Sequence, residues 1–211
     1  MARTEWITCN ACGADEFKPL GQVDEWRIGE CGRCALVYVN PVPFFEPSSE
    51  FSSMSLDFQY TRFQREVTRE IRAHDRSQFR RQCAEAARLV GRDLARGRFL
   101  DVGCGTGSTV AAAAELGWQA TGIDIDPALV DIGRRAHGAD LRCGTLPEPT
   151  LASEQFDFVR MRDVIEHLPN PRAVLAEVRR LLVRDGVLLV ATPNEGSLPT
   201  RVRSLAGRPR N

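Results

Sequence analysis

The sequence of 211 residues predicts an α/β protein with a doubly wound, mostly parallel sheet and a small separate module in front of it. Two observations carry this prediction. From residue 98 onward, strand-like and helix-like segments alternate, which is the order that a parallel sheet requires. Near the N-terminus, four cysteines form two C-x-x-C pairs, a spacing typical of four-thiolate zinc sites. We expect a zinc ribbon over 1–42, a connector with amphipathic helices over 43–97, and the larger domain over 98–211.

The zinc ligands are predicted from their spacing. The two pairs are separated by eighteen residues, and short strand-like segments lie between them. The predicted ligands of one structural Zn²⁺ are Cys9, Cys12, Cys31 and Cys34. A redox-active pair or chance clustering is the alternative. The remaining cysteines are predicted to be small buried side chains: Cys83, Cys104 and Cys143.

Each element of the larger domain has a local signal. Apolar residues recur at helical spacing between 61 and 90, which predicts one long or two short amphipathic helices. Five strands are predicted over 98–103, 118–124, 140–143, 156–161 and 187–192. Helices are predicted over about 106–116, over 127–138 and after Asn170. Pro127 and Pro171 suit the first position of a helix, with Asp126 and Asn170 as the caps before them.

Composition limits the classes of partner. Basic and acidic residues balance at 28 each, so the overall charge indicates neither nucleic acid nor a membrane surface. Residues 62–98 carry eleven arginines against five acids, which fits either a solvated helix face or a basic docking surface. No stretch approaches the roughly 18 apolar residues that span a bilayer. The N-terminus also lacks an apolar signal sequence, so we expect a cytoplasmic protein.

The stretch "FLDVGCGTGS" at 99–108 is typical of a loop that holds a nucleotide-like ligand. Glycines at alternate positions let main-chain N–H groups approach the ligand, and a carboxylate about twenty residues later, Asp124, suits a ribose diol. The spacing disfavours NAD, because the dinucleotide pattern places its third glycine where Ser108 stands. Asp101, just before the glycines, suits a cationic amino group better than a pyrophosphate.

Four successive segments resemble the motifs of class I S-adenosylmethionine-dependent methyltransferases. They are "FLDVGCGTG", "TGIDIDP", "FDFVRMRDVIEHLPNP" and "LLVRDGVLLVATPN", and they cover about 98–194. The front end, "CNACG…CGRCALVYVNPVP", resembles the zinc-ribbon segment that precedes this domain in one bacterial branch. The resemblance implies a Rossmann-like methyltransferase sheet and S-adenosylmethionine as the cofactor. It also implies that the last two strands are lacking, which leaves 187–192 as an apolar edge for a partner or a second copy to cover.

The resemblance also implies a set of cofactor-binding residues. Asp101 would face the cofactor's amino group, Asp124 would bind the ribose, and Ile125 would pack on the adenine. The full implied set is Asp101, Gly103, Cys104, Gly105, Gly107, Asp124, Ile125, Thr145, Leu146, Arg162 and Asp163. One departure is that Thr145 and Leu146 stand where many relatives have an acid that accepts from the adenine amine.

Glu166 and His167 are the candidate catalytic residues, because they follow the fourth strand beside the expected methyl group. His167 could take a proton from the acceptor as a general base. Two alternatives stay open: His167 packs within its loop, or the pair holds a divalent metal, since related quinone-ring methyltransferases also have an acid–histidine pair here.

We expect methyl transfer to a small-molecule or sugar-like acceptor. The alternatives are a non-catalytic cofactor-binding or partner-binding module, a ribosomal RNA methyltransferase, and, least favoured, an NAD oxidoreductase. The zinc ribbon is expected to act as a scaffold or lid. An RNA-reading ribbon is disfavoured because acids outnumber bases between the cysteine pairs.

Overall fold

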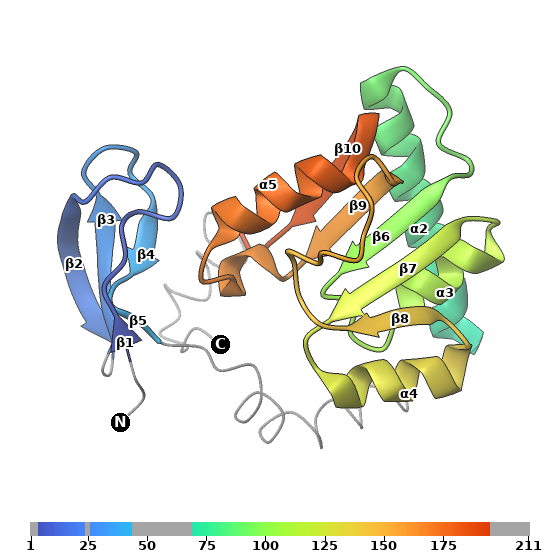
Figure 1. Cartoon of the computed structure of the whole chain (residues 1–211), viewed down its shortest axis with the longest axis horizontal. Coiled ribbons are helices and arrows are strands. Elements are labelled where there is room, and N and C mark those ends of the chain that lie inside the picture. Colours follow the sequence, from blue (N-terminus) through green and yellow to red (C-terminus); the bar gives the residue numbers. More distant parts are fainter. Residues whose placement is uncertain (1–3, 24–25, 44–68, 195–211) are drawn as a thin grey trace.

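The computed structural model describes residues 4–23, 26–43 and 69–194 (Figure 1). Residues 44–68 of the predicted connector lie outside the described residues, as does the C-terminal segment 195–211. Two parts are described: a small antiparallel β-module at the N-terminus and a larger α/β domain.

The N-terminal module is a three-stranded antiparallel sheet in the order β2-β3-β4. The strands before and after it in the chain, β1 and β5, form a separate antiparallel pair. Its strands are β1 (Thr4–Glu5), β2 (Phe17–Val23), β3 (Trp26–Cys31), β4 (Val37–Val39) and β5 (Val42–Pro43). The rings of Trp6, Phe17 and Tyr38 form successive edge-to-face contacts with centroids 6.0 and 5.4 Å apart. The buried Asn40 side chain accepts from the Ile7 N–H at 3.0 Å and donates to its carbonyl at 2.9 Å, so these contacts and the cysteines hold a module with little apolar core.

The larger domain is built on a five-stranded sheet in which every pairing is parallel and the order is β10-β9-β6-β7-β8. The strands are β6 (Arg98–Val102), β7 (Gln119–Asp124), β8 (Asp140–Cys143), β9 (Phe156–Arg162) and β10 (Leu182–Ala191). Strand order reverses between β6 and β9, so their carboxyl ends form the switch point at which ligands of doubly wound sheets bind. This confirms the predicted fold class.

Helices cover both faces of this sheet (Figure 1). They are α2 (Arg69–Val90), α3 (Ser108–Glu115), α4 (Pro127–His137), the short 3₁₀ helix η1 (Ile165–His167) and α5 (Pro171–Leu181). On one face, Phe79 of α2 packs against Phe99, Trp118 and Phe158, with ring centroids 4.8 to 6.0 Å apart. On the other face, α5 buries its apolar side against the core that includes Leu100 and Met161.

The predicted helix caps are present. The Asp126 side chain accepts from the N–H of Ala128 at 2.8 Å, and that of Asn170 accepts from the N–H of Ala173 at 3.1 Å. Both helices begin with proline at the next residue, as expected. Their start points were therefore readable from local sequence.

Two expectations about the end of the chain and the cysteines need correction. The last strand begins at Leu182 rather than 187, and the Asp185–Gly186 segment lies inside it, where its pairing with β9 slips between Leu182 and Val187. Cys143 is exposed rather than buried, because it ends the edge strand β8, and Cys104 is half-buried, whereas Cys83 is buried as expected.

Within the described residues, β10 is the other edge of the sheet. None of the helices described there is long and apolar enough to cross a membrane.

Candidate cofactor site and metal centre

The glycine loop after β6 depends on backbone conformations that side chains disfavour. Gly103, Gly105 and Gly107 have φ values of +71°, +56° and +73°. A Cβ at Gly103 would lie 2.2 Å from Val164 Cγ2, so this position also excludes a side chain sterically. Gly105 has open space around it, and a ligand could approach its backbone closely. The loop then leads directly into the N-terminus of α3 at Ser108.

Asp124, at the carboxyl end of β7, is bonded to this loop. Its Oδ2 accepts from the Gly105 N–H at 2.7 Å, and its Oδ1 accepts from the Asp126 N–H at 2.9 Å. Burial raises the pKa of Asp124, and these two N–H groups oppose that shift. Because a carboxylate can accept about four hydrogen bonds, Asp124 retains capacity for ribose hydroxyls while it shapes the loop.

Asp101 is enclosed more completely than expected of a residue facing a ligand. It is 2% exposed, and its Oδ2 accepts from Arg160 Nη1 at 2.9 Å. Burial raises the pKa of Asp101 to about 6, although the adjacent Arg160 acts to lower it. Asp101 therefore lies beneath the glycine loop, already paired with a cation.

The residues predicted to contact the adenine differ in exposure. Ile125 is half-buried and Thr145 is exposed, so both side chains can reach a ligand at the ends of β7 and β8. Leu146 is 3% exposed and belongs to the core under α5, so only its main chain can line a site. The Cys104 thiol packs over Gly122, 2.7 Å from the place of a Cβ there, which leaves its main chain for the ligand side.

The predicted catalytic pair lies on η1, immediately after β9. Glu166 and His167 are both exposed, and the His167 N–H donates to the Val164 carbonyl at 2.9 Å. Since Val164 also packs on Gly103, this segment is held against the glycine loop. Val164 is a site residue that sequence reasoning missed, because an apolar side chain after a strand has no distinctive signal.

Arg162 is the last residue of β9, and Asp163 follows it, next to this segment. Arg162 Nε lies 3.5 Å from Asp163 Oδ2, and its Nη1 donates to Gln78 of α2 at 3.4 Å. Asp163 has φ of +53°, a left-handed conformation that is uncommon outside glycine and often found at functional sites. Both side chains are exposed at the switch point, where the cofactor's open side was expected.

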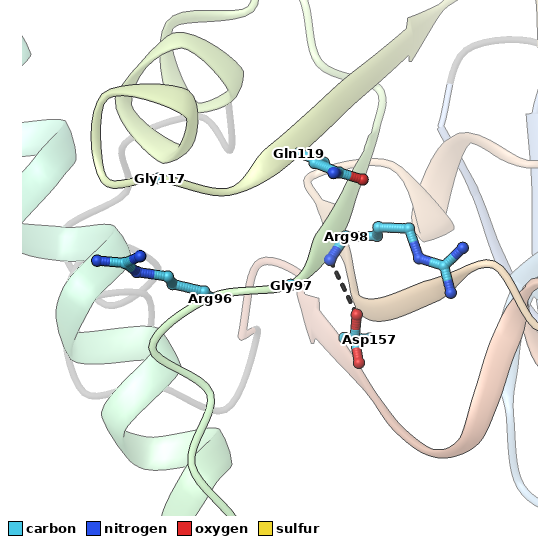
Figure 2. A pocket seen from close by; sticks show the side chains of 6 residues that line it. All are labelled: Arg96, Gly97, Arg98, Gly117, Gln119 and Asp157. Carbon is cyan, nitrogen blue, oxygen red and sulfur yellow. Dashed lines mark hydrogen bonds between the residues drawn. The ribbon is translucent and has the colours of Figure 1, made fainter.

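Two cavities lie away from these residues. One cavity has a volume of about 350 Å³. Figure 2 shows the residues that line it, among which the Arg98 N–H donates to Asp157 Oδ2 at 2.9 Å. Arg98, Gln119 and Asp157 all stand at the amino ends of their strands, so this cavity is at the wrong edge of the sheet for a ligand of this fold. A second cavity of about 850 Å³ lies between α5 and β10. The site is therefore assigned from the glycine loop rather than from the cavities.

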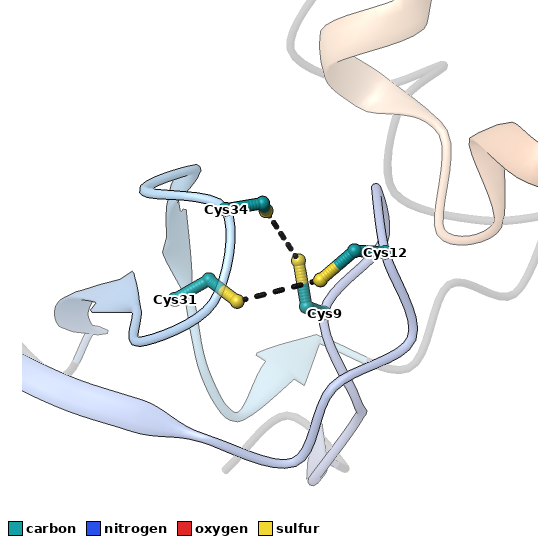
Figure 3. A group of neighbouring side chains, drawn as sticks. All are labelled: Cys9, Cys12, Cys31 and Cys34. Carbon is teal, nitrogen blue, oxygen red and sulfur yellow. Dashed lines mark hydrogen bonds between the residues drawn. The ribbon is translucent and has the colours of Figure 1, made fainter.

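The four predicted zinc ligands converge in the N-terminal module (Figure 3). Their sulfur atoms all lie within 4.8 Å of one another, with Cys9 to Cys34 at 3.5 Å and Cys12 to Cys31 at 3.6 Å. Sulfurs around a tetrahedral Zn²⁺ are about 3.8 Å apart, given a Zn–S bond of about 2.3 Å. The two turns are alike: the Gly13 N–H donates to the Cys9 carbonyl at 2.8 Å, and that of Ala35 donates to Cys31 at 3.0 Å. The donor set and geometry fit zinc.

Comparison with known proteins supports the assignment of the 98–211 domain to the methyltransferases. The profile of the family described as "Methyltransferase domain" matches residues 72–210, about two thirds of the chain. A "Ubiquinone biosynthesis O-methyltransferase" from Xanthomonas oryzae pv. oryzae is 40% identical over 111 residues, which cover 48% of this chain and 45% of that protein. Its counterpart from Xanthomonas campestris pv. campestris is 38% identical over 117 residues, which cover 52% and 47%. The chain thus spans about half the length of these curated relatives.

A solved structure has the same fold. It is the "SAM-dependent methyltransferase, possible histamine N-methyltransferase" from Thermotoga maritima, with a TM-score of 0.50 and 22% identity over 71% of this chain and 66% of that one. The family match, the strand order and the glycine loop with Asp124 agree with one another. This chain belongs to the class I S-adenosylmethionine-dependent methyltransferase family and carries an N-terminal four-cysteine cluster consistent with a zinc ribbon.

Proposed function

We propose that this chain binds S-adenosylmethionine at the carboxyl ends of β6 and β7 and promotes transfer of its methyl group to a hydroxyl of a small-molecule acceptor. The observation that carries the proposal is the hydrogen bond from the Gly105 N–H to Asp124, which joins a carboxylate suited to a ribose diol to the glycine loop. The relatives named as O-methyltransferases of ubiquinone biosynthesis support a small-molecule acceptor with an oxygen nucleophile.

When bound, the cofactor supplies an electrophilic methyl carbon on a cationic sulfur. Asp124 and the main chain of the glycine loop would hold the cofactor, which would give its methyl group to the acceptor oxygen and keep the electrons of its carbon–sulfur bond. The protein aligns the two groups and excludes water, which accounts for much of the rate enhancement in such reactions. The proton that the acceptor loses passes to His167, which is exposed on η1 beside the glycine loop.

The remaining cofactor contacts extend the same proposal. Ile125 and Thr145 lie where the adenine would be bound, and the main chain of Cys104 and Leu146 completes that side. Arg162 and Asp163 border the open side that the acceptor enters. In the N-terminal module the four cysteines hold a structural Zn²⁺, and this ribbon acts as a scaffold or lid for the 98–211 domain.

Calorimetry with S-adenosylmethionine, S-adenosylhomocysteine and NAD tests the cofactor assignment. We expect the first two to bind and NAD not to bind. The Asp124→Ala variant should lose about five- to thirtyfold in affinity for both adenosyl ligands, because the ribose contact is worth about one to two kcal/mol. Unchanged affinity would show that Asp124 does not hold the ribose.

Incubation with methyl-labelled cofactor and a bacterial extract tests the acceptor class. Label in the small-molecule fraction that is lost in His167→Ala supports the proposal. Label in RNA would favour the ribosomal RNA methyltransferase alternative. Binding without transfer to any fraction would favour a non-catalytic cofactor-binding module.

A further inference from the structure

Arg160 is a buried charge that the proposed function does not use. It lies within β9 and is only 6% exposed, although a guanidinium stays charged in proteins. The register of the sheet places it directly opposite Asp101 on β6, so both side chains leave the sheet on the same face. A buried charge in the sheet is costly unless a partner balances it, so the contacts of Arg160 should explain why a charged residue stands there.

The contacts of Arg160 frame the glycine loop. Its Nη1 donates to Asp101 Oδ2 and to Thr109 Oγ1, each at 2.9 Å. Asp101 lies two residues before Gly103, and Thr109 is in the first turn of α3. One guanidinium therefore joins the strand that enters the loop to the helix that leaves it. Its buried Nε has no hydrogen-bond partner in the part of the chain that the structure describes.

We propose that Arg160 is a positioning residue for cofactor binding: it keeps Asp101 as an ionised, oriented carboxylate beneath the glycine loop, where that charge attracts the ammonium end of the cofactor. This inference rests on the proposed function, because it requires a ligand with a cationic amino acid end at this loop. It goes beyond that function by giving a role to a residue of β9 that has no place in the glycine-loop motif.

The charge state of Asp101 is the property through which Arg160 acts. Burial raises the pKa of Asp101 to about 6, Arg160 and the more distant Arg162 of β9 lower it, and Asp124 of β7 raises it. From α3, the neutral hydroxyl of Thr109 contacts the same guanidinium. Removal of Arg160 therefore raises the pKa of Asp101 further, so that the carboxyl group is protonated near neutral pH and no longer attracts a cation.

The test is calorimetric affinity for S-adenosylmethionine between pH 5.5 and 9 in the wild type, Arg160→Met and Arg160→Lys. Wild-type affinity should fall as the pH drops through about 6. In Arg160→Met the fall should occur at least one pH unit higher, which leaves at most about half of Asp101 ionised at pH 7 and weakens binding there by about twofold or more. Arg160→Lys keeps a cation and should stay close to the wild type. S-adenosylhomocysteine should show the same profile, because it retains the ammonium group and lacks only the sulfonium charge.

A purely structural role predicts a different result. Arg160→Met would then lower the melting temperature and leave the pH profile of binding unchanged, which overturns the inference. If Arg160→Met does not fold, the comparison of the wild type with Asp101→Asn decides: a midpoint near pH 6 that disappears in Asp101→Asn supports it, and equal profiles overturn it. Absence of any binding to the wild type would overturn the proposed function together with this inference, whereas normal binding with a pH-independent profile overturns the inference alone.

Discussion

Replacing Gly133 by alanine tests whether α4 and the glycine loop form one packed unit. Gly133 is buried in α4, and a Cβ there would lie 2.2 Å from the Thr106 carbonyl oxygen and 2.6 Å from Leu141 Cδ1. The leucine could rotate away, but the carbonyl belongs to the main chain between Gly105 and Gly107. The added methyl group therefore has to displace either the helix or the cofactor loop.

The size of the effect follows from this distance. Real Cβ contacts are essentially never shorter than 3.0 Å, so the main chain must move by about 0.8 Å, the difference between 3.0 and 2.2 Å. Overpacking of a core costs about 1–3 kcal/mol, and a main-chain clash belongs at the upper end of that range. The better helix propensity of alanine offsets about 1 kcal/mol. We expect Gly133→Ala to lose about 2 kcal/mol in free energy of unfolding and to bind S-adenosylmethionine about tenfold more weakly.

Urea unfolding and calorimetry measure the two effects. The control is Gly21→Ala in β2, where an added Cβ meets nothing within 4 Å and both quantities should stay close to the wild type. If Gly133→Ala were as stable as the control and bound the cofactor equally well, α4 would not pack against the loop and the reasoning would be wrong.

Three further predictions concern the core, the pH dependence and the zinc centre. Phe79→Ala should cost about 3–5 kcal/mol in urea unfolding because it empties the aromatic cluster under α2, whereas Leu89→Ala, at a residue 85% exposed, should change stability by less than about 0.5 kcal/mol. The pKa of Asp101 is about 6 in the folded protein against 3.8 ordinarily, so the folded state binds that proton more tightly. This group should therefore raise the free energy of unfolding by about 2 kcal/mol as the pH falls from about 6 to 4, and an equally steep slope in Asp101→Asn would contradict the assignment. Elemental analysis should find one zinc per chain, and less than one in Cys12→Ser. A metal-free protein whose N-terminal β-module is still folded would refute the zinc site.

Much of this architecture could be predicted from local sequence. The alternation of strands and helices, the proline-started helices capped by Asp126 and Asn170, and the glycine loop each depend on residues close together in the chain. The four-cysteine cluster was predictable as well, because each C-x-x-C pair forms its own turn. Such features are determined by backbone preferences and by short-range hydrogen bonds, which the order of residues specifies directly.

Other features depend on contacts between distant segments and could not be predicted. Sequence patterns did not reveal that Arg160 pairs with Asp101, because that contact depends on strand order and on the register between β6 and β9. The same is true of Val164 on Gly103 and of Cys143 at an exposed edge. The sequence alone determined the elements and the loop that can hold a cofactor. Only the tertiary structure decided which charges meet beneath that loop, because burial and pairing are properties of neighbours brought together by folding.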